Sequence, residues 1–162
     1  MLTLVVDGAD ALQARLDAYP AALASDLAAK AQALASALAD KVKYQKLAGE
    51  ALVSRSGALA ASIAAEVSGD GEDITATVGS FGDVKYAAIQ EYGGKTGAHE
   101  ILPGKAGVLA FMADGAMHFA RRVEHPGSVI PERSYLRSSL DEMGAEIVAA
   151  LAATASESWE AT

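Results

Sequence analysis

Ser80–Gly107 reads SFGDVKYAAIQEYGGKTGAHEILPGKAG and joins the two halves of the 162-residue chain. Val84–Tyr92 can form a short helix. Gly93 and Gly94 are expected to end it, because glycine tolerates the left-handed conformation with which helices often stop. Lys95–Gly107 has little periodicity, and so long a connection in a compact domain tends to be functional or mobile. A plain surface connection is the alternative.

The upstream half is predicted to be mainly helical. Residues 2–6 alternate as in a short strand, and Pro20 is expected to break the helix that follows. From Ala21 to about Leu47, apolar residues share one narrow stripe at helical spacing. Either the sheet or another subunit can cover this stripe, and burial in the domain's own core is the default. The stripe consists of Leu23, Leu27, Ala31, Leu34, Leu38 and Val42.

Two hairpins and a second long helix complete the pattern. Glycine turns, Gly69-Asp70-Gly71 and Asp114-Gly115, each lie between two strand-like runs, which is a strong hairpin signal. A second amphipathic helix is predicted from Leu136 to about residue 153, followed by a frayed tail. The four strand-like runs are Ile63–Val67, Ile74–Val78, Val108–Ala113 and Ala116–Val123.

These elements predict an α+β fold. A four-stranded, mainly antiparallel sheet is expected to be packed by the long N-terminal helix and the C-terminal amphipathic helix. We expect one domain over residues 1–162: a helical arm with a short N-terminal strand (1–48), then sheet, central loop and C-terminal helix (49–153), then the frayed tail (154–162).

Composition argues against several classes of function. The net charge of −8 disfavours binding to nucleic acid or to anionic membranes. Cysteine is absent, and His99, His118 and His125 lack the spacing of metal ligands. We therefore expect no catalytic, cofactor or metal site; an enzyme site assembled from distant residues is the alternative.

Three motifs in order resemble a family. They are KLAGEAL followed by SRSGAL (Lys46–Leu59), VGS followed by YAAIQEYGG (Val78–Gly94), and HPG followed by IPERSYLRSSL (His125–Leu140). Together they are similar to the tailed-phage tail-completion and head–tail joining (neck) proteins, which include Z-type minor tail proteins and phage morphogenesis proteins. The resemblance covers about residues 46–140. Ser56 and Ser134 stand where the family often has threonine and proline.

The resemblance implies a non-enzymatic virion protein of the neck, assembled in the host bacterial cytoplasm, that completes the tail and joins it to the head. It implies a ring of copies, a hexamer, between head-closure or portal-side proteins and tail-tube or terminator proteins. DNA would pass through the lumen without specific binding, and no membrane would be involved. A tail terminator or head-closure (stopper or adaptor) ring is the alternative; a small binding module or an enzyme is less favoured.

The resemblance and the central stretch also suggest an interface. Its candidate residues come from the end of the short helix, the central loop and the start of the last helix. They are Tyr86, Gln90, Glu91, Tyr92, Gly93, Gly94, Ile101, Leu102, Arg133, Tyr135 and Arg137.

Overall fold

The computed structural model describes residues 7–53, 55–69, 73–104 and 107–162. The chain up to Ala87, together with Ser134–Thr162, forms one compact unit (unit 1), and Ala88–Arg133 forms another (unit 2). The expectation of a single domain stays a prediction. The expected strand at residues 2–6 and the turn residues Asp70 and Gly71 lie outside the described residues.

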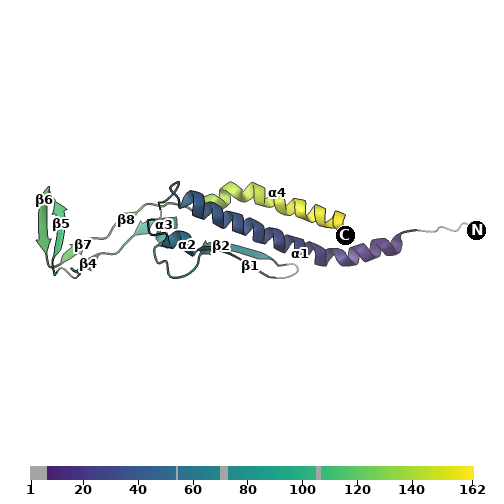
Figure 1. The fold of residues 1–162 in the computed structure, drawn as a ribbon, viewed down its shortest axis with the longest axis horizontal. Helices are drawn as coiled ribbons and strands as arrows, with labels where there is room; N and C mark the ends of the chain where they lie inside the picture. The colour runs from purple at the N-terminus through teal and green to yellow at the C-terminus, as the bar shows by residue number, and fades with distance from the viewer. Residues whose placement is uncertain (1–6, 54, 70–72, 105–106) are drawn as a thin grey trace, which may run out of the picture. The chain divides into compact units, whose positions relative to one another are not determined.

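One long helix dominates unit 1. Helix α1 spans Ala9–Lys41 and continues into a π-helical turn, η1, over Val42–Lys46. The predicted break at Pro20 is wrong, because Pro20 lies inside α1. Helix-forming alanines surround this proline, and the helix bends along its N-terminal part, as Figure 1 shows, rather than stopping there. The predicted end near Leu47 is confirmed.

A short helix and the first hairpin follow. Helix α2 (Ala58–Ser62) leads into strands β1 (Ile63–Ser68) and β2 (Thr75–Ser80), which pair antiparallel from Ile63 opposite Ser80. This hairpin confirms the first predicted strand pair.

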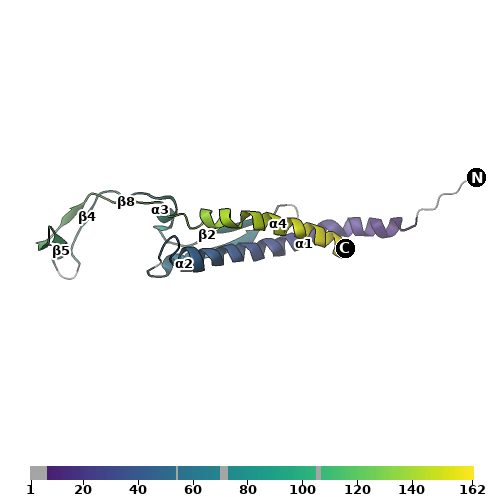
Figure 2. The same cartoon turned by 90° about the horizontal axis from the view of Figure 1, so that it is seen from above.

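Helix α1 packs against three elements of unit 1, namely β1, β2 and the last helix, α4 (Arg137–Ala161). Figures 1 and 2 show α4 and the β1–β2 hairpin running alongside α1. The α1 stripe is thus covered within the domain's own fold at its C-terminal end. The buried core consists of Ala39, Val42, Leu47, Leu59, Ile63 and Tyr135.

Helix α4 is longer than predicted. Residues after 153 were expected to fray, but the helix runs to Ala161. Its last turns are held by α1: the Trp159 ring lies edge-on to Tyr19 at 5.2 Å, and the Arg15 guanidinium lies 4.7 Å from the centroid of the same ring. Arg15 also donates to the Trp159 carbonyl at 2.8 Å. These contacts join residues far apart in the sequence, so the pattern around residue 153 could not show them.

Unit 2 is built from three antiparallel pairs. After helix α3 (Ala87–Tyr92), strand β3 (Gly94–Lys95) pairs with β8 (Val129–Ile130), and β4 (His99–Ile101) pairs with β7 (Val123–His125). The central stretch is therefore not one long irregular loop. Its short strands pair with partners 22 to 36 residues away in the sequence, and local periodicity cannot reveal such pairs.

The second predicted hairpin is confirmed. Strands β5 (Leu109–Ala113) and β6 (Ala116–Ala120) pair antiparallel across a two-residue turn. Asp114 has φ 51° and Gly115 has φ 77°, and two positive φ values are what a type I′ turn requires.

The α+β class is confirmed, but the single four-stranded sheet is wrong. Among the described residues the strands form four separate two-stranded ladders: β1–β2, β3–β8, β4–β7 and β5–β6. The two predicted hairpins belong to different compact units, and neither strand of one hairpin pairs with a strand of the other.

Candidate interface

No compact reaction site stands out in the described part of the chain. There, no three His, Asp or Glu side chains are grouped so that they could hold a metal ion. None of the helices described is both long enough and apolar enough to cross a membrane.

The histidines contribute to the β-structure of unit 2. His99 and His125 lie opposite each other in the β4–β7 ladder, with their rings stacked at 5.0 Å. The Gly127 N–H donates to His125 Nδ1 at 3.0 Å. Arg122 beside them forms an ion pair with Glu100 at 2.9 Å. This small polar cluster links the two strands and fixes the turn after β7.

An ion-pair cluster links the end of α1 to α4. Lys46 is 4% exposed and pairs with Glu50 and with Glu142, while Lys41 reaches the other oxygen of Glu142 at 2.8 Å. Hydrogen bonds to Glu142 and then to Glu50 raise the pKa of Lys46. Hydrogen bonds from Lys41 and then Lys46 lower the pKa of Glu142. Lys46 is the first residue of the first motif, and its ion pair with Glu142 links the end of the first long helix to α4.

The candidate interface residues divide by exposure. Glu91 and Tyr135 are buried at 2% and 1% exposure. Gln90 and Gly93 are partly exposed. The remaining residues lie at the surface: Tyr86, Tyr92, Gly94, Ile101, Leu102, Arg133 and Arg137. The interface role of all these residues stays a prediction.

The less exposed members shape the backbone. The Tyr135 hydroxyl donates to the Ala87 carbonyl at 3.2 Å within unit 1. In unit 2 the Arg133 N–H donates to the Gln90 carbonyl at 3.0 Å. Gly93 has φ +69°, and a Cβ there would lie 2.7 Å from the Glu132 nitrogen. The second and third motifs are therefore brought together at these points by backbone contacts.

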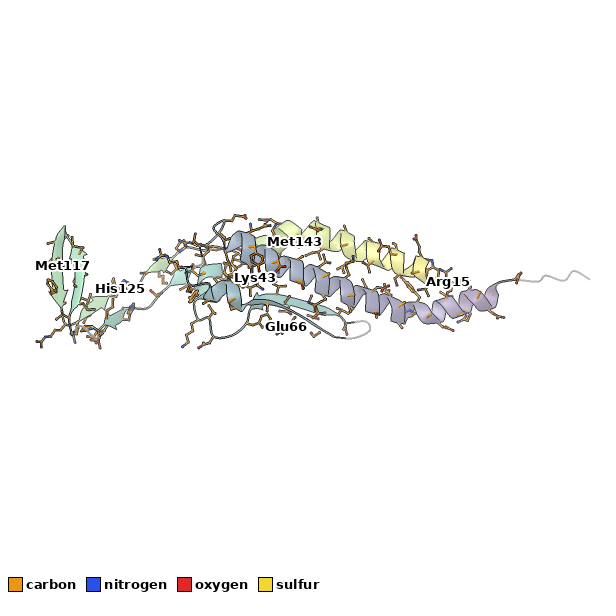
Figure 3. The ribbon with its side chains drawn as sticks, in the orientation of Figure 1. Arg15, Lys43, Glu66, Met117, His125 and Met143 are labelled. Atoms are coloured by element: carbon orange, nitrogen blue, oxygen red, sulfur yellow. The ribbon has the colours of Figure 1, made fainter. Side chains whose placement is uncertain are left out.

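Sequence reasoning missed an exposed apolar surface in unit 2. One face of the β5–β6 hairpin carries Ala110, Met112, Met117 and Phe119, and we call it the hairpin face. Met112, Met117 and Phe119 are 64%, 56% and 69% exposed. Figure 3 shows Met117 on this hairpin. The available signal was that apolar residues occupy both faces of these strands, without the alternation of a strand covered on one side only.

Comparison with known families identifies the chain. A family model described as "Bacteriophage HK97-gp10, putative tail-component" matches residues 10–93, from the start of α1 to the glycine after α3. No curated protein and no solved structure matches the chain. The match spans more than half of the chain and confirms the resemblance predicted from the motifs. The chain belongs to the HK97-gp10-like family, whose members are structural components of the bacteriophage tail and hence of the virion.

Proposed function

We propose that this protein completes the phage tail and joins it to the head, as a ring of copies around the channel through which DNA passes. The observation that carries the proposal is the family match over residues 10–93, which makes the chain a tail component. The motif order beyond that match, as far as Leu140, resembles neck proteins in particular and extends the same argument.

Charge supports a place beside passing DNA. The net charge of −8 gives a surface that repels phosphate rather than holding it. A channel component with this charge lets DNA slide past, whereas a basic lining would bind it.

The exposed candidate residues support contacts with neighbours. Tyr86 and Tyr92 are 43% and 63% exposed, and Leu102 is 63% exposed. Tyrosine and arginine are enriched where proteins bind one another. In the proposed ring these residues contact adjacent copies, a head-closure or portal-side protein, or the tail tube or its terminator. The resemblance favours six copies.

The test is to delete the gene from the phage and supply the protein from a plasmid. We expect deletion lysates to contain filled heads and separate tails, and we expect plasmid expression to restore joined, infectious particles. A density map of the restored virion should place a ring of this protein between the portal and the tail tube.

Three results would contradict the proposal. A ring that caps the tail tube on its own would support a tail terminator instead, and one bound to the portal without tails would support a head-closure stopper. Normal yields of joined particles after deletion would show that the protein is not needed for joining.

A further inference from the structure

The β5–β6 hairpin is an uncovered apolar element. Among the elements described, β5 and β6 pack extensively only with each other. Large side chains project from both faces: Phe111 is 39% exposed on one face, and Phe119 is 69% exposed on the other. A lone two-stranded hairpin is marginally stable in water, and clustered exposed apolar side chains mark sites where a partner binds.

The hairpin is also nearly free of charge. Between Val108 and Ala120, Asp114 at the turn is the one Asp, Glu, Lys or Arg. Elsewhere the chain carries an excess of acidic residues, so two copies repel each other over most of their surface. An uncharged apolar face is a surface through which one acidic copy can contact another without placing like charges together.

A second apolar row lies on α4. Leu140 and Val148 are 49% and 69% exposed, and Gly144 lies between them at helical spacing. A Cβ at Gly144 would meet no atom within 4 Å. These three residues, which we call the α4 stripe, form a row of two exposed aliphatic side chains with an open gap in the middle.

Charges beside the two surfaces are complementary. Arg121 directly follows β6 at the base of the hairpin, and Asp141 directly follows Leu140 on α4; both are exposed. Neither residue has an ion pair within the described part of the chain. A basic group beside one apolar surface and an acidic group beside the other favour their association.

We propose that the hairpin face of one copy docks on the α4 stripe of a second copy, with Phe119 filling the gap over Gly144. The proposal deepens the proposed function and rests on it, because it supplies the contact between copies in the ring. The two surfaces differ, so each copy donates its hairpin to one neighbour and receives a hairpin from the other. Such a head-to-tail contact closes into a ring when the rotation from one copy to the next divides evenly into a full turn.

The size of the contact predicts weak association in solution. The hairpin face consists of four side chains, far fewer than the roughly 20–30 residues that each partner contributes to a standard stable interface. Purified protein is therefore expected to be mostly monomeric at micromolar concentration, and the ring forms where other virion proteins hold copies together.

Disulfide trapping tests the contact directly, because the chain contains no cysteine. One preparation carries Phe119→Cys and another Gly144→Cys; they are mixed at high concentration and oxidised. We expect a covalent pair between the two variants. The double variant should form a ladder of dimers, trimers and larger products, because every copy then both donates and receives. The control pairs Phe119→Cys with Ala153→Cys, which is exposed elsewhere on α4, and should stay unlinked.

A second pair of variants tests the same surface by adding a charge beside the trapping site. Val148→Arg should abolish trapping between hairpin and stripe when it is added to the Gly144→Cys copy, whereas Ala149→Arg, on the neighbouring exposed position, should leave it intact. Both sites are exposed, so both variants should keep the parent's circular dichroism spectrum and melting temperature.

Several outcomes would overturn the proposal. One is that Ala153→Cys is trapped as efficiently as Gly144→Cys. Another is that Val148→Arg leaves trapping intact, as Ala149→Arg does. A third is that the double variant forms only a disulfide within single chains, which would mean that the hairpin docks within its own copy. Binding of the protein to neutral lipid vesicles that is lost in Phe119→Ser, without trapping between copies, would assign the hairpin to a membrane. A virion that shows the protein in the neck while trapping fails would reject this contact and leave the proposed function standing.

Discussion

Gly93 and Gly97 lie four residues apart but differ in what an added methyl group would meet. Gly93 has a left-handed backbone with Glu132 and Ile130 packed against it, whereas nothing lies within 4 Å of a Cβ at Gly97. Gly93→Ala should lower the free energy of unfolding by about 1–3 kcal/mol through strain and backbone crowding. Gly97→Ala is the matched control and should have little effect. Urea denaturation of both variants checks this, and equal stability would contradict it.

Glu142 makes the stability of the fold depend on pH. Its pKa is lowered in the folded chain by hydrogen bonds from Lys41 and Lys46, relative to an ordinary value of 4.5. A carboxyl whose pKa is lowered by folding stabilises the fold above its unfolded pKa, and this contribution is lost as pH falls through the folded value. Glu142→Gln should therefore be less stable than the parent at pH 7, and the difference should shrink below about pH 4.

Denaturation curves between pH 3 and pH 7.5 measure this difference. Glu146→Gln serves as the control, since Glu146 is exposed on the same helix and has no ion pair in the described part of the chain. A constant gap between Glu142→Gln and the parent over the whole pH range would mean that the carboxylate charge is not responsible.

For single residues, the sequence predicts a role correctly when that role depends only on neighbouring residues in the chain. Asp114-Gly115 requires only the turn's own dihedral angles, so the hairpin could be predicted from two residues. Lys46 could not be assigned in the same way, because its role depends on Glu142, nearly a hundred positions away. The stacking of His99 on His125 depends equally on a distant pairing.

Among the elements, α1 contains an unfavourable residue that can be removed. Pro20 is exposed inside the helix, where it withholds one backbone hydrogen bond and crowds the preceding turn. Pro20→Ala should straighten the helix and raise the free energy of unfolding by roughly 1–3 kcal/mol. Ser25→Ala, an exposed control in the same helix, should gain no more than about 0.5 kcal/mol. Equal gains in thermal denaturation would show that the proline is not strained.

Strand β4 and the residue after it provide a second test at this scale. Ile101 and Leu102 are 36% and 63% exposed, so they do not fill the domain's own core. Replacing both with serine should therefore leave the melting temperature within a few degrees of the parent, while joined, infectious particles are lost if a neighbour covers them. Val53→Ser, which removes an equally exposed apolar side chain in unit 1, is the control. A much lower melting temperature for the double variant would contradict docking.

The presence of helices and hairpins was easier to predict than which elements pack or pair with one another. Helical spacing revealed α1 and α4, and glycine turns revealed both hairpins. The partners of β3 and β4 and the last turns of α4 depend on contacts between distant segments, which no periodicity records. Trp159 illustrates this: its neighbours in sequence are small and polar, and Arg15 and Tyr19 hold it in place.

For the whole molecule, charge gives the clearest expectation. With a net charge of −8, the protein should not bind DNA at physiological salt, because few basic groups are available to replace the counterions of phosphate. A mobility-shift assay with double-stranded DNA should show free DNA up to low micromolar protein. A shift at sub-micromolar protein that disappears on adding salt would contradict this.

Only part of the candidate interface could be predicted from the sequence. Motif order pointed to Tyr86–Gly94 and Arg133–Arg137, where exposed aromatic and basic residues do lie. The hairpin face went unnoticed, because Met112 and Phe119 were interpreted as members of a covered sheet. Whether a side chain is exposed depends on which elements pack together. The division of the chain into two compact units could not be predicted from composition or periodicity.

The path of the chain between these units has a consequence for how far a resemblance to relatives can extend. The backbone leaves unit 1 at Ala87 and re-enters it at Ser134, and the hydrogen bond from Tyr135 to the Ala87 carbonyl keeps exit and return adjacent. Residues 88–133 are thus inserted between two points of unit 1 that stay adjacent. An insertion between adjacent points can change in length or sequence without moving the elements on either side of it. The family match, which stops at residue 93, ends just inside this inserted segment.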